Sequence, residues 1–217
     1  MHFEVPKAKS FKEFGGEYLM IVISIITALA LEHAVQTWHH RHLAHQAAAR
    51  IEAEIQANIQ ELDKVLAHNK AEVKKLGALR DAMLAGFQAK EDNRTLLSHL
   101  AADNKNGGLS VVVPALRREA WEVAIASQAA SWMTQQELER YSGVYTNMRD
   151  IQNLASGGGT AFLNGPGMMD VFSNIQIGDG DAKALYRTVR QMISAYDSLD
   201  GNLQGLRDDL AKAAGQH

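Results

Sequence analysis

The stretch from Glu17 to Leu76 contains neither proline nor glycine, and this feature most constrains the fold. Proline breaks a helix interior, and glycine costs about 1 kcal/mol there relative to alanine. So long a run without either residue predicts one continuous helix. Composition agrees, because the chain has only 3 prolines in 217 residues and only 6% aromatic residues. We therefore expect an all-α fold.

The start of this helix is apolar enough to cross a membrane. Leu19–Leu31 is apolar apart from one serine and one threonine, but as a helix it spans only about 20 Å of a hydrocarbon core of about 30 Å. Tyr18 and Trp38 extend it, because a helix holds them about 30 Å apart, where the two membrane interfaces favour such rings. The predicted organisation is an N-terminal flank over 1–16, a transmembrane helix over 17–38 and a soluble helical domain over 39–217.

Two other interpretations of the apolar run stay open. Ala28-Leu29-Ala30 has the small-x-small form of a signal-peptidase site, although helix-forming residues continue straight through it. Apolar runs of this length also occur in helices buried in soluble cores. The lysines before the run and the aromatic residue after it favour the membrane interpretation.

The basic residues on either side bear on the orientation of the span. Lys7, Lys9 and Lys12 precede it, and Arg41 and Arg50 follow it. Because cytoplasmic flanks carry the excess of lysine and arginine, this balance predicts the N-terminus inside and the C-terminal domain outside the cytoplasm. The margin is one charge.

Glu32 and His33 are unusual residues for the end of a span. If the span reaches Trp38, Glu32 lies about 9 Å inside the interface, where a carboxylate usually has a partner. One interpretation pairs it with His33 of a neighbouring chain. The other shifts the helix towards Phe14, so that both side chains reach the headgroups.

Beyond the span, apolar residues repeat at alternating intervals of four and three, the pattern of a coiled coil or helical bundle. The predicted seam consists of Ile55, Ile59, Leu62, Leu66, Asn69, Val73 and Leu76, continued by Met83 and Phe87. Asn69 either fixes the register inside this seam or faces water at the edge of a bundle.

The C-terminal segment repeats the same spacing without interruption, through Leu185, Val189, Met192, Tyr196, Leu199, Leu203, Leu206 and Leu210. Gly178-Asp179-Gly180-Asp181 supplies a cap for the start of this helix. Each apolar stripe must be buried against something. We therefore expect the two helices to pack antiparallel, within one chain or across a dimer, which makes a homo-oligomer or a helical protein partner the expected assembly.

Shorter elements lie between the two long helices. The sequence predicts a brief helix over 95–102, an extended piece over 109–113 ahead of Pro114, and a helix over 115–126. Thr134-x-x-Glu137 forms a capping box that opens a further helix. That helix is expected to end before Ser156, with a loop continuing to Gly167.

A histidine-rich stretch follows the span. His39, His42 and His45 are spaced by three, so a helix places them along one side, and imidazole is a common ligand of zinc, copper and nickel. They are candidate metal ligands, above all if two chains contribute. The alternatives are ordinary interfacial residues or a pH-sensitive cluster.

Other constellations that carry chemistry are weak. Gly157-Gly158-Gly159-Thr160 lacks the lysine of a phosphate-binding loop. Trp121, Trp132, Tyr141 and Tyr145 line a pocket or, more commonly at such spacing, form core. We find no catalytic motif and expect no enzymatic activity and no cofactor. A net charge of −3 argues against nucleic-acid binding, and the absence of cysteine excludes thiolate chemistry.

Two parts of the sequence resemble a group of bacterial single-span membrane proteins of unassigned function. Gly16-Glu17-Tyr18, the apolar run and Gln36-Thr37-Trp38 look like the group's anchor. Arg118–Glu122 and Leu138–Tyr145 look like its later helices. Glu32-His33 and the histidines after Trp38 depart from that pattern. The resemblance implies a protein of the bacterial inner membrane with a helical C-terminal domain, here expected in the periplasm.

These observations favour one function over another. The first expectation is a membrane-anchored helical interaction or scaffold protein that contacts membrane lipid and oligomerises. The alternative is a membrane-anchored sensor or ligand-binding domain, responsive to metal or pH. Neither is tied to a named ligand.

Overall fold

The computed structural model describes residues 11–103, 112–162 and 165–215, and all regular structure within them is helical. The predicted all-α class is confirmed. The elements are α1 (Phe11–Gln88), α2 (Asn93–Asp103), α3 (Glu119–Ala126), the 3₁₀ turn η1 (Ala129–Trp132), α4 (Gln135–Phe162), α5 (Gly165–Gln176) and α6 (Ala182–Gly215).

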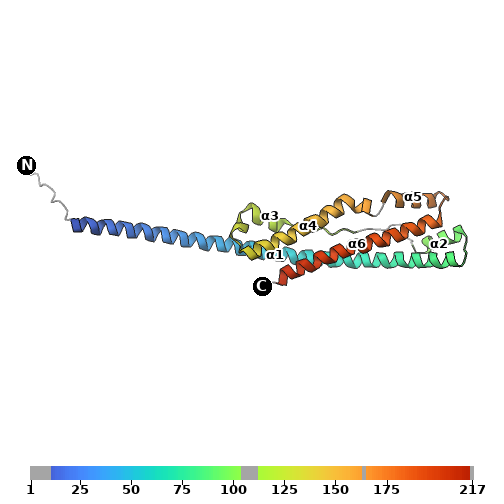
Figure 1. Ribbon diagram of the computed structural model, residues 1–217, viewed down its shortest axis with the longest axis horizontal. Helices are drawn as coiled ribbons and strands as arrows, with labels where there is room; N and C mark the ends of the chain where they lie inside the picture. Colours follow the sequence, from blue (N-terminus) through green and yellow to red (C-terminus); the bar gives the residue numbers. More distant parts are fainter. Residues whose placement is uncertain (1–10, 104–111, 163–164, 216–217) are drawn as a thin grey trace, which may run out of the picture.

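The molecule is a rod built on α1, which is one helix of 78 residues (Figure 1). Its first part, here called the projecting segment (residues 15–43), extends for most of its length beyond the other described helices. Its second part, the bundle segment (residues 44–88), packs along α6, with α4 and α5 following one another along the bundle. The end of the rod opposite the projecting segment is here called the distal end, and the α2 helix folds back there. The α3 helix and η1 lie at the other end of the bundle, from which the projecting segment emerges.

The bundle segment buries one stripe of side chains whose spacing alternates strictly between four and three. The stripe consists of Ala44, Ala48, Ile51, Ile55, Asn58, Leu62, Val65, Asn69, Glu72, Leu76, Leu79, Met83 and Gly86. Five of the predicted seam residues, Ile55, Leu62, Asn69, Leu76 and Met83, lie in it. Ile59, Leu66 and Val73 lie beside it and are half-buried. The predicted register is therefore displaced by one residue at every second position.

The α6 helix buries all eight apolar residues of its predicted seam, from Leu185 to Leu210. It runs antiparallel to α1 within one chain, as expected from the paired stripes. Two contacts fix the register: Arg207 Nε donates to Asp63 Oδ1 over 3.0 Å, and Asn69 Nδ2 donates to Asp200 Oδ1 over 2.8 Å. A lone apolar stripe has no stable alternative to such burial in water.

Two hydrophobic cores succeed one another along the rod. The first joins α1, α3, α4 and the C-terminal half of α6, around Ile55, Tyr141 and Leu203. The second joins the distal part of α1 to α2, α5 and the N-terminal half of α6, around Met83 and Leu185. The polar side chains of Asn69 and Asp200 meet between them.

Two predicted boundaries are wrong. The helix predicted over 115–126 begins only at Glu119, because residues 112–118 are held without helix against α1. The loop predicted over 156–167 is mostly helix, since α4 continues to Phe162 and α5 begins at Gly165. Glycine weakens a helix without breaking it, so a helix already formed by packed residues propagates through it. Of the predicted extended piece, 109–111 lie outside the described residues.

The predicted helix starts have the expected caps. Thr134 N donates to Glu137 Oε2 over 2.8 Å, and Glu137 N donates back to Thr134 Oγ1 over 3.2 Å, which is a complete capping box. This backbone donor lowers the pKa of Glu137. At the start of α6, Asp181 accepts from Lys183 N over 3.0 Å. These bonds satisfy amide groups that helix starts leave unpaired.

Candidate functional site

The projecting segment of α1 is the one described helix that is long and apolar enough to cross a membrane, judged by length and composition. Most of its large apolar side chains are exposed, among them those of Leu19, Ile26 and Leu31. Tyr18 is 64% exposed and Trp38 is 68% exposed, at the two ends expected for interfacial rings. The apolar run is therefore not buried in a core of this chain, whereas cleavage as a signal peptide stays a prediction.

Polar side chains in the projecting segment find their partners on the same helix. Ser24 Oγ donates to the Met20 carbonyl and Thr27 Oγ1 to the Ile23 carbonyl, each over 2.8 Å. These bonds satisfy the hydroxyls without any other element. Further along, Gln36 Nε2 donates to Glu32 Oε1 over 3.1 Å.

Glu32 therefore has an amide partner one turn away on the same helix, and His33 is exposed beside it. The predicted pairing of Glu32 with His33 of a neighbouring chain stays a prediction. So does a reach of both side chains to the headgroups.

The histidines after the span take part in ring stacking. The rings of Trp38 and His42 stack with centroids 5.7 Å apart, and Gln46 Nε2 lies 2.9 Å from His42 Nε2. His39 and His45 are exposed. In the part of the chain that the structure describes, no group of three histidine, cysteine, aspartate or glutamate side chains could hold a metal ion. One chain therefore does not assemble the predicted site from His39, His42 and His45.

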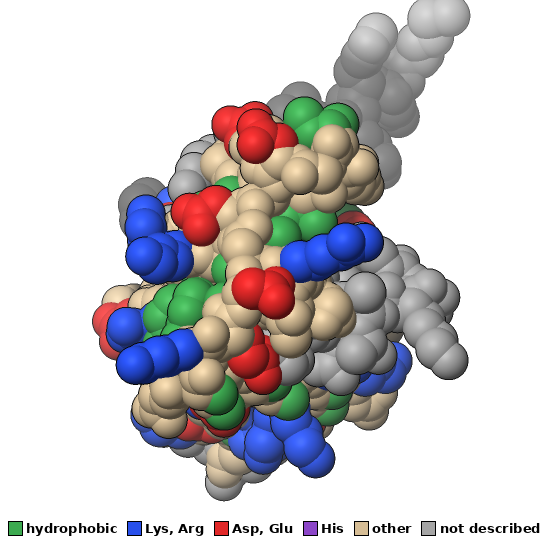
Figure 2. Space-filling model, turned by 90° about the vertical axis from the view of Figure 1, so that its right-hand side faces the viewer, with side chains coloured by type: hydrophobic (Ala, Val, Ile, Leu, Met, Phe, Trp, Pro, Cys, Tyr) green, Lys and Arg blue, Asp and Glu red, His purple; other side chains and the backbone are tan. Residues whose placement is uncertain are grey.

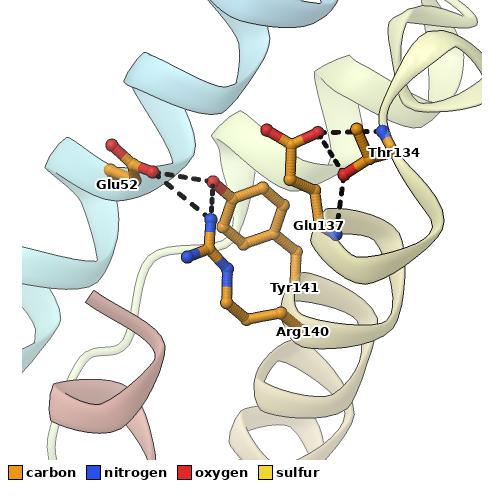
Figure 3. A network of polar contacts seen from close by, with 5 residues as sticks. All are labelled: Glu52, Thr134, Glu137, Arg140 and Tyr141. Carbon is orange, nitrogen blue, oxygen red and sulfur yellow. Dashed lines mark hydrogen bonds and ion pairs between the residues drawn. The ribbon is translucent and has the colours of Figure 1, made fainter. Parts of the chain in front are cut away.

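A network of polar side chains joins α1 to α4 (Figure 3). Tyr141 Oη donates to Glu52 Oε1 over 2.9 Å, and Arg140 Nη2 donates to Tyr141 Oη over 2.7 Å. Arg140 Nη2 also lies 3.5 Å from Glu52 Oε1. Burial, followed by the hydrogen bond to Glu52, raises the pKa of Tyr141 to about 12. The phenol therefore stays protonated and serves as a hydrogen-bond donor.

A second phenol–carboxylate pair lies one turn further along. Tyr145 Oη donates to Glu54 Oε1 over 2.6 Å, and Ala120 N at the start of α3 donates to Glu54 Oε2 over 3.0 Å. Burial, and then this hydrogen bond, raise the pKa of Tyr145 far above its usual range. Glu54 thereby links α1, α3 and α4, and the phenol is not placed for acid–base chemistry near neutral pH.

Three of the four aromatic residues proposed for a pocket come together. Trp121 stacks on Tyr145 with ring centroids 5.6 Å apart and meets Tyr141 edge-on at 6.5 Å. The two tyrosines are buried core residues and Trp121 packs against them, so these rings belong to the first hydrophobic core. Trp132 lies elsewhere, stacked on His40.

Asn58 clamps the non-helical chain ahead of α3 onto α1. Its Nδ2 donates to the Arg117 carbonyl and its Oδ1 accepts from Arg117 N, both over 2.9 Å. Next to this clamp is an open polar cleft of about 600 Å³, lined by Ala57, Asn58, Gln60, Glu61, Lys64, Ala115, Leu116, Arg117, Glu119 and Gln152.

A polar layer separates the two cores. Asn69 is fully buried, so it occupies the seam and does not face water. Its Nδ2 donates to Asp200, whereas its Oδ1 is buried with no hydrogen-bond partner among the described residues. Burial raises the pKa of Asp200, partly offset by that hydrogen bond. Nearby Glu72 is also buried and pairs with Lys75 over 2.6 Å.

Sequence reasoning missed Asn58 and Glu72 as buried polar residues, and Glu52, Glu54 and Asp200 as half-buried ones. A signal existed for two of them, since Asn58 and Glu72 fall on the same heptad spacing as the apolar residues of the stripe. Glu52, Glu54 and Asp200 lie beside the buried stripes, and no local sequence pattern predicts their distant partners.

No protein-family model, curated protein sequence or solved structure matches the chain. The resemblance to bacterial single-span proteins therefore stays a prediction.

Proposed function

We propose that this chain is a single-span membrane protein that holds a helical interaction domain at a bacterial inner membrane, with the domain on the periplasmic side. The observation that carries the proposal is the continuity of α1, which passes from an exposed apolar segment into the bundle without a break. Because α1 is unbroken, the orientation of the span in the membrane would fix the orientation of the domain.

The domain acts as a spacer in this proposal. From Trp38 to Gln88, α1 extends about 75 Å at the α-helical rise. The distal end carries small apolar areas among acidic and basic side chains (Figure 2). Leu84 and Ile177 are 42% and 76% exposed there. A mixed surface of this kind is typical of a transient protein contact and not of a permanent apolar interface.

The expected oligomer needs another surface than the two seams. Both seams are buried against each other in one chain. A second copy or a helical partner would therefore bind through the distal end or through the outer faces of the span. Chemical crosslinking in detergent across a range of concentrations tests this, and a monomer at every concentration would remove the homo-oligomer.

Paired cysteine variants test the topology, because the chain has no cysteine of its own. Gly15→Cys lies before the apolar run in open space, and Lys183→Cys is exposed at the first turn of α6. Intact cells are treated with a membrane-impermeant maleimide, with lysed cells as the control. We expect labelling of Lys183→Cys and protection of Gly15→Cys. Equal labelling of both would exclude a single span, and the reverse pattern would put the domain in the cytoplasm.

A ligand-binding role is the second candidate, and the cleft beside Asn58 is the observation that favours it. Arg117, Lys64, Glu61 and Glu119 line the cleft and offer charges of both signs to a small polar ligand. A ligand that binds only the folded state raises its melting temperature. Thermal shifts of the full chain with a metabolite set, repeated with Lys64→Ala, test it, and no shift with any compound removes this candidate.

A further inference from the structure

Trp132 keeps much of its ring exposed although a partner for it exists within the chain. It ends η1, the turn between α3 and α4, and its side chain is 49% exposed. The other face of the ring stacks on His40, with centroids 3.6 Å apart and planes inclined by 7°. This contact fixes η1 at one position along α1.

That position coincides with the end of the span. His40 lies two residues beyond Trp38, which is about 3 Å along the helix axis. A headgroup layer is about 5–8 Å deep on each side of the hydrocarbon core. In a span perpendicular to the membrane, with Trp38 at the outer interface, Trp132 would lie within the same layer.

We propose that η1 is a second membrane contact, in which Trp132 enters the lipid headgroup layer of the leaflet that holds Trp38. The inference rests on the membrane anchoring proposed above and adds a residue and an element to it. An indole ring prefers this layer because it combines an apolar body with an N–H donor. Arg41 is exposed on α1 next to the stacked pair, and its charge suits lipid phosphates.

The position along the rod distinguishes Trp132 from other exposed apolar residues. Ile177 is more exposed than Trp132, at 76%, but it lies in the turn before α6, where the Gly180 carbonyl accepts a hydrogen bond from Asn93 at the start of α2. This is the end of the rod furthest from the proposed interface. Bilayer lipid cannot reach it. Exposure alone would not identify a lipid contact, whereas exposure at the level of Trp38 does.

Two membrane contacts on different elements restrict the orientation of the domain more than a single contact does. A single helix crossing a bilayer can turn about its own axis and tilt, since neither motion exposes its apolar surface. An inserted Trp132 stands to one side of α1, so tilting α1 towards the opposite side would lift the ring out of the headgroups. The contact would therefore select one direction of tilt of the bundle relative to the membrane plane.

The test uses the full chain reconstituted in phosphatidylcholine–phosphatidylglycerol nanodiscs. Ser131→Cys, exposed beside Trp132, carries an environment-sensitive fluorophore, and a lipid with a spin label on its headgroup acts as quencher. Lys183→Cys at the distal end is the matched control. We expect emission from residue 131 to fall about twofold and emission from residue 183 to stay constant. Equal emission with and without quencher at residue 131 would overturn the contact.

Substitution of the ring itself sharpens the test. Trp132→Ala should abolish the quenching at residue 131, and Trp132→Phe should keep most of it, because phenylalanine retains an aromatic ring at the same depth. Ile177→Ala should leave the quenching unchanged. Unaltered thermal unfolding of each variant shows that the bundle is intact. Quenching that persists in Trp132→Ala would assign the contact to another residue and overturn the role of Trp132.

Flotation separates this inference from the proposed function. If the wild-type chain fails to float with liposomes, membrane anchoring itself is wrong. If it floats while the label at residue 131 stays unquenched, only the second contact is wrong. Disulfide-linked dimers of unlabelled Ser131→Cys, formed without quenching, would mean that a second copy covers η1 and would likewise overturn the proposal.

Discussion

The polar side chains of the two segments of α1 differ in where their hydrogen-bond partners lie. In the projecting segment, Ser24 and Thr27 bond to carbonyls of their own helix. In the bundle segment, Asn58 and Asn69 are buried and bond to residues far away in the sequence. A helix that meets lipid can satisfy polar groups only locally. A helix in a folded bundle can use them to bind other elements at defined positions.

This difference shows how the side chains of one continuous helix can suit both an exposed apolar segment and a packed bundle. A helix that crosses lipid needs apolar side chains on every face, whereas a helix in a bundle needs them on one stripe only. Polar residues in that stripe cost burial energy unless they are paired, so each one specifies a partner. Asn58 specifies the chain before α3, and Asn69 specifies Asp200 on α6.

The largest expected effect comes from placing the same charge in each segment. Ile55→Asp puts an unpaired carboxylate into a fully buried site, and we expect the free energy of unfolding to fall by more than about 4 kcal/mol. Ile26→Asp should cost about 3 kcal/mol of membrane insertion and leave bundle unfolding unchanged. Urea denaturation and carbonate extraction measure the two effects. If Ile26→Asp also weakened the bundle, the two segments would not be independent.

The next effect concerns the clamp. Asn58→Leu keeps the side-chain volume but leaves the N–H and the carbonyl of Arg117 without their partner. We expect a loss of about 2–4 kcal/mol in the free energy of unfolding, together with faster proteolysis near Arg117. Gln60→Leu, an exposed change on the same helix, is the control. A loss no larger than the control's would mean that water replaces the clamp.

Tyr145→Phe should cost about 1–2 kcal/mol, because Glu54 loses a buried hydrogen-bond donor. It also alters the response to alkali. The raised pKa means that the native state keeps the phenolic proton above the ordinary value of 10.0, where the unfolded chain loses it. Wild-type stability should therefore decrease as the pH rises above 10, and less steeply in Tyr145→Phe. The free energy of unfolding is measured by urea denaturation at pH 9 and pH 11 for both proteins. An equal decrease in the wild type and in Tyr145→Phe would contradict this expectation.

The smallest effect is expected at the polar layer. Burial raises the pKa of Asp200, so the native state binds the proton more tightly than the unfolded chain. Stability should thus decrease as the pH rises from the ordinary value of 3.8 through the raised pKa. Asp200→Asn removes this dependence, keeps an acceptor for Asn69 and should stabilise the protein by less than about 1 kcal/mol at neutral pH. A destabilised variant would mean that the charge of Asp200 is needed.

The sequence predicted most of the fold because helix spacing is a local property. All eight seam residues of α6 are buried as expected, since every one of them is apolar. In α1 the apolar pattern selected Ile59 and Val73, whereas the buried positions are their neighbours Asn58 and Glu72. Hydrophobicity alone cannot find a buried polar residue when its partner comes from another part of the chain.

The candidate site was harder to predict for the same reason. The spacing of Tyr18 and Trp38 gave the ends of the apolar segment, and both rings are exposed there. The spacing of His39, His42 and His45 suggested a metal site that one chain does not form. The contact between His40 and Trp132 depends on how α3 and η1 return to α1, which no local pattern encodes.

The long helix is covered by a helix that the ribosome makes much later. Synthesis from Gln88 to Gly215, at about 5–20 residues per second, takes on the order of ten seconds. During that time the stripe from Ile51 to Met83 has no α6 to cover it. The nascent chain therefore passes through a period in which its core is open to chaperones and to other nascent copies, and a product truncated before α6 would remain in that condition.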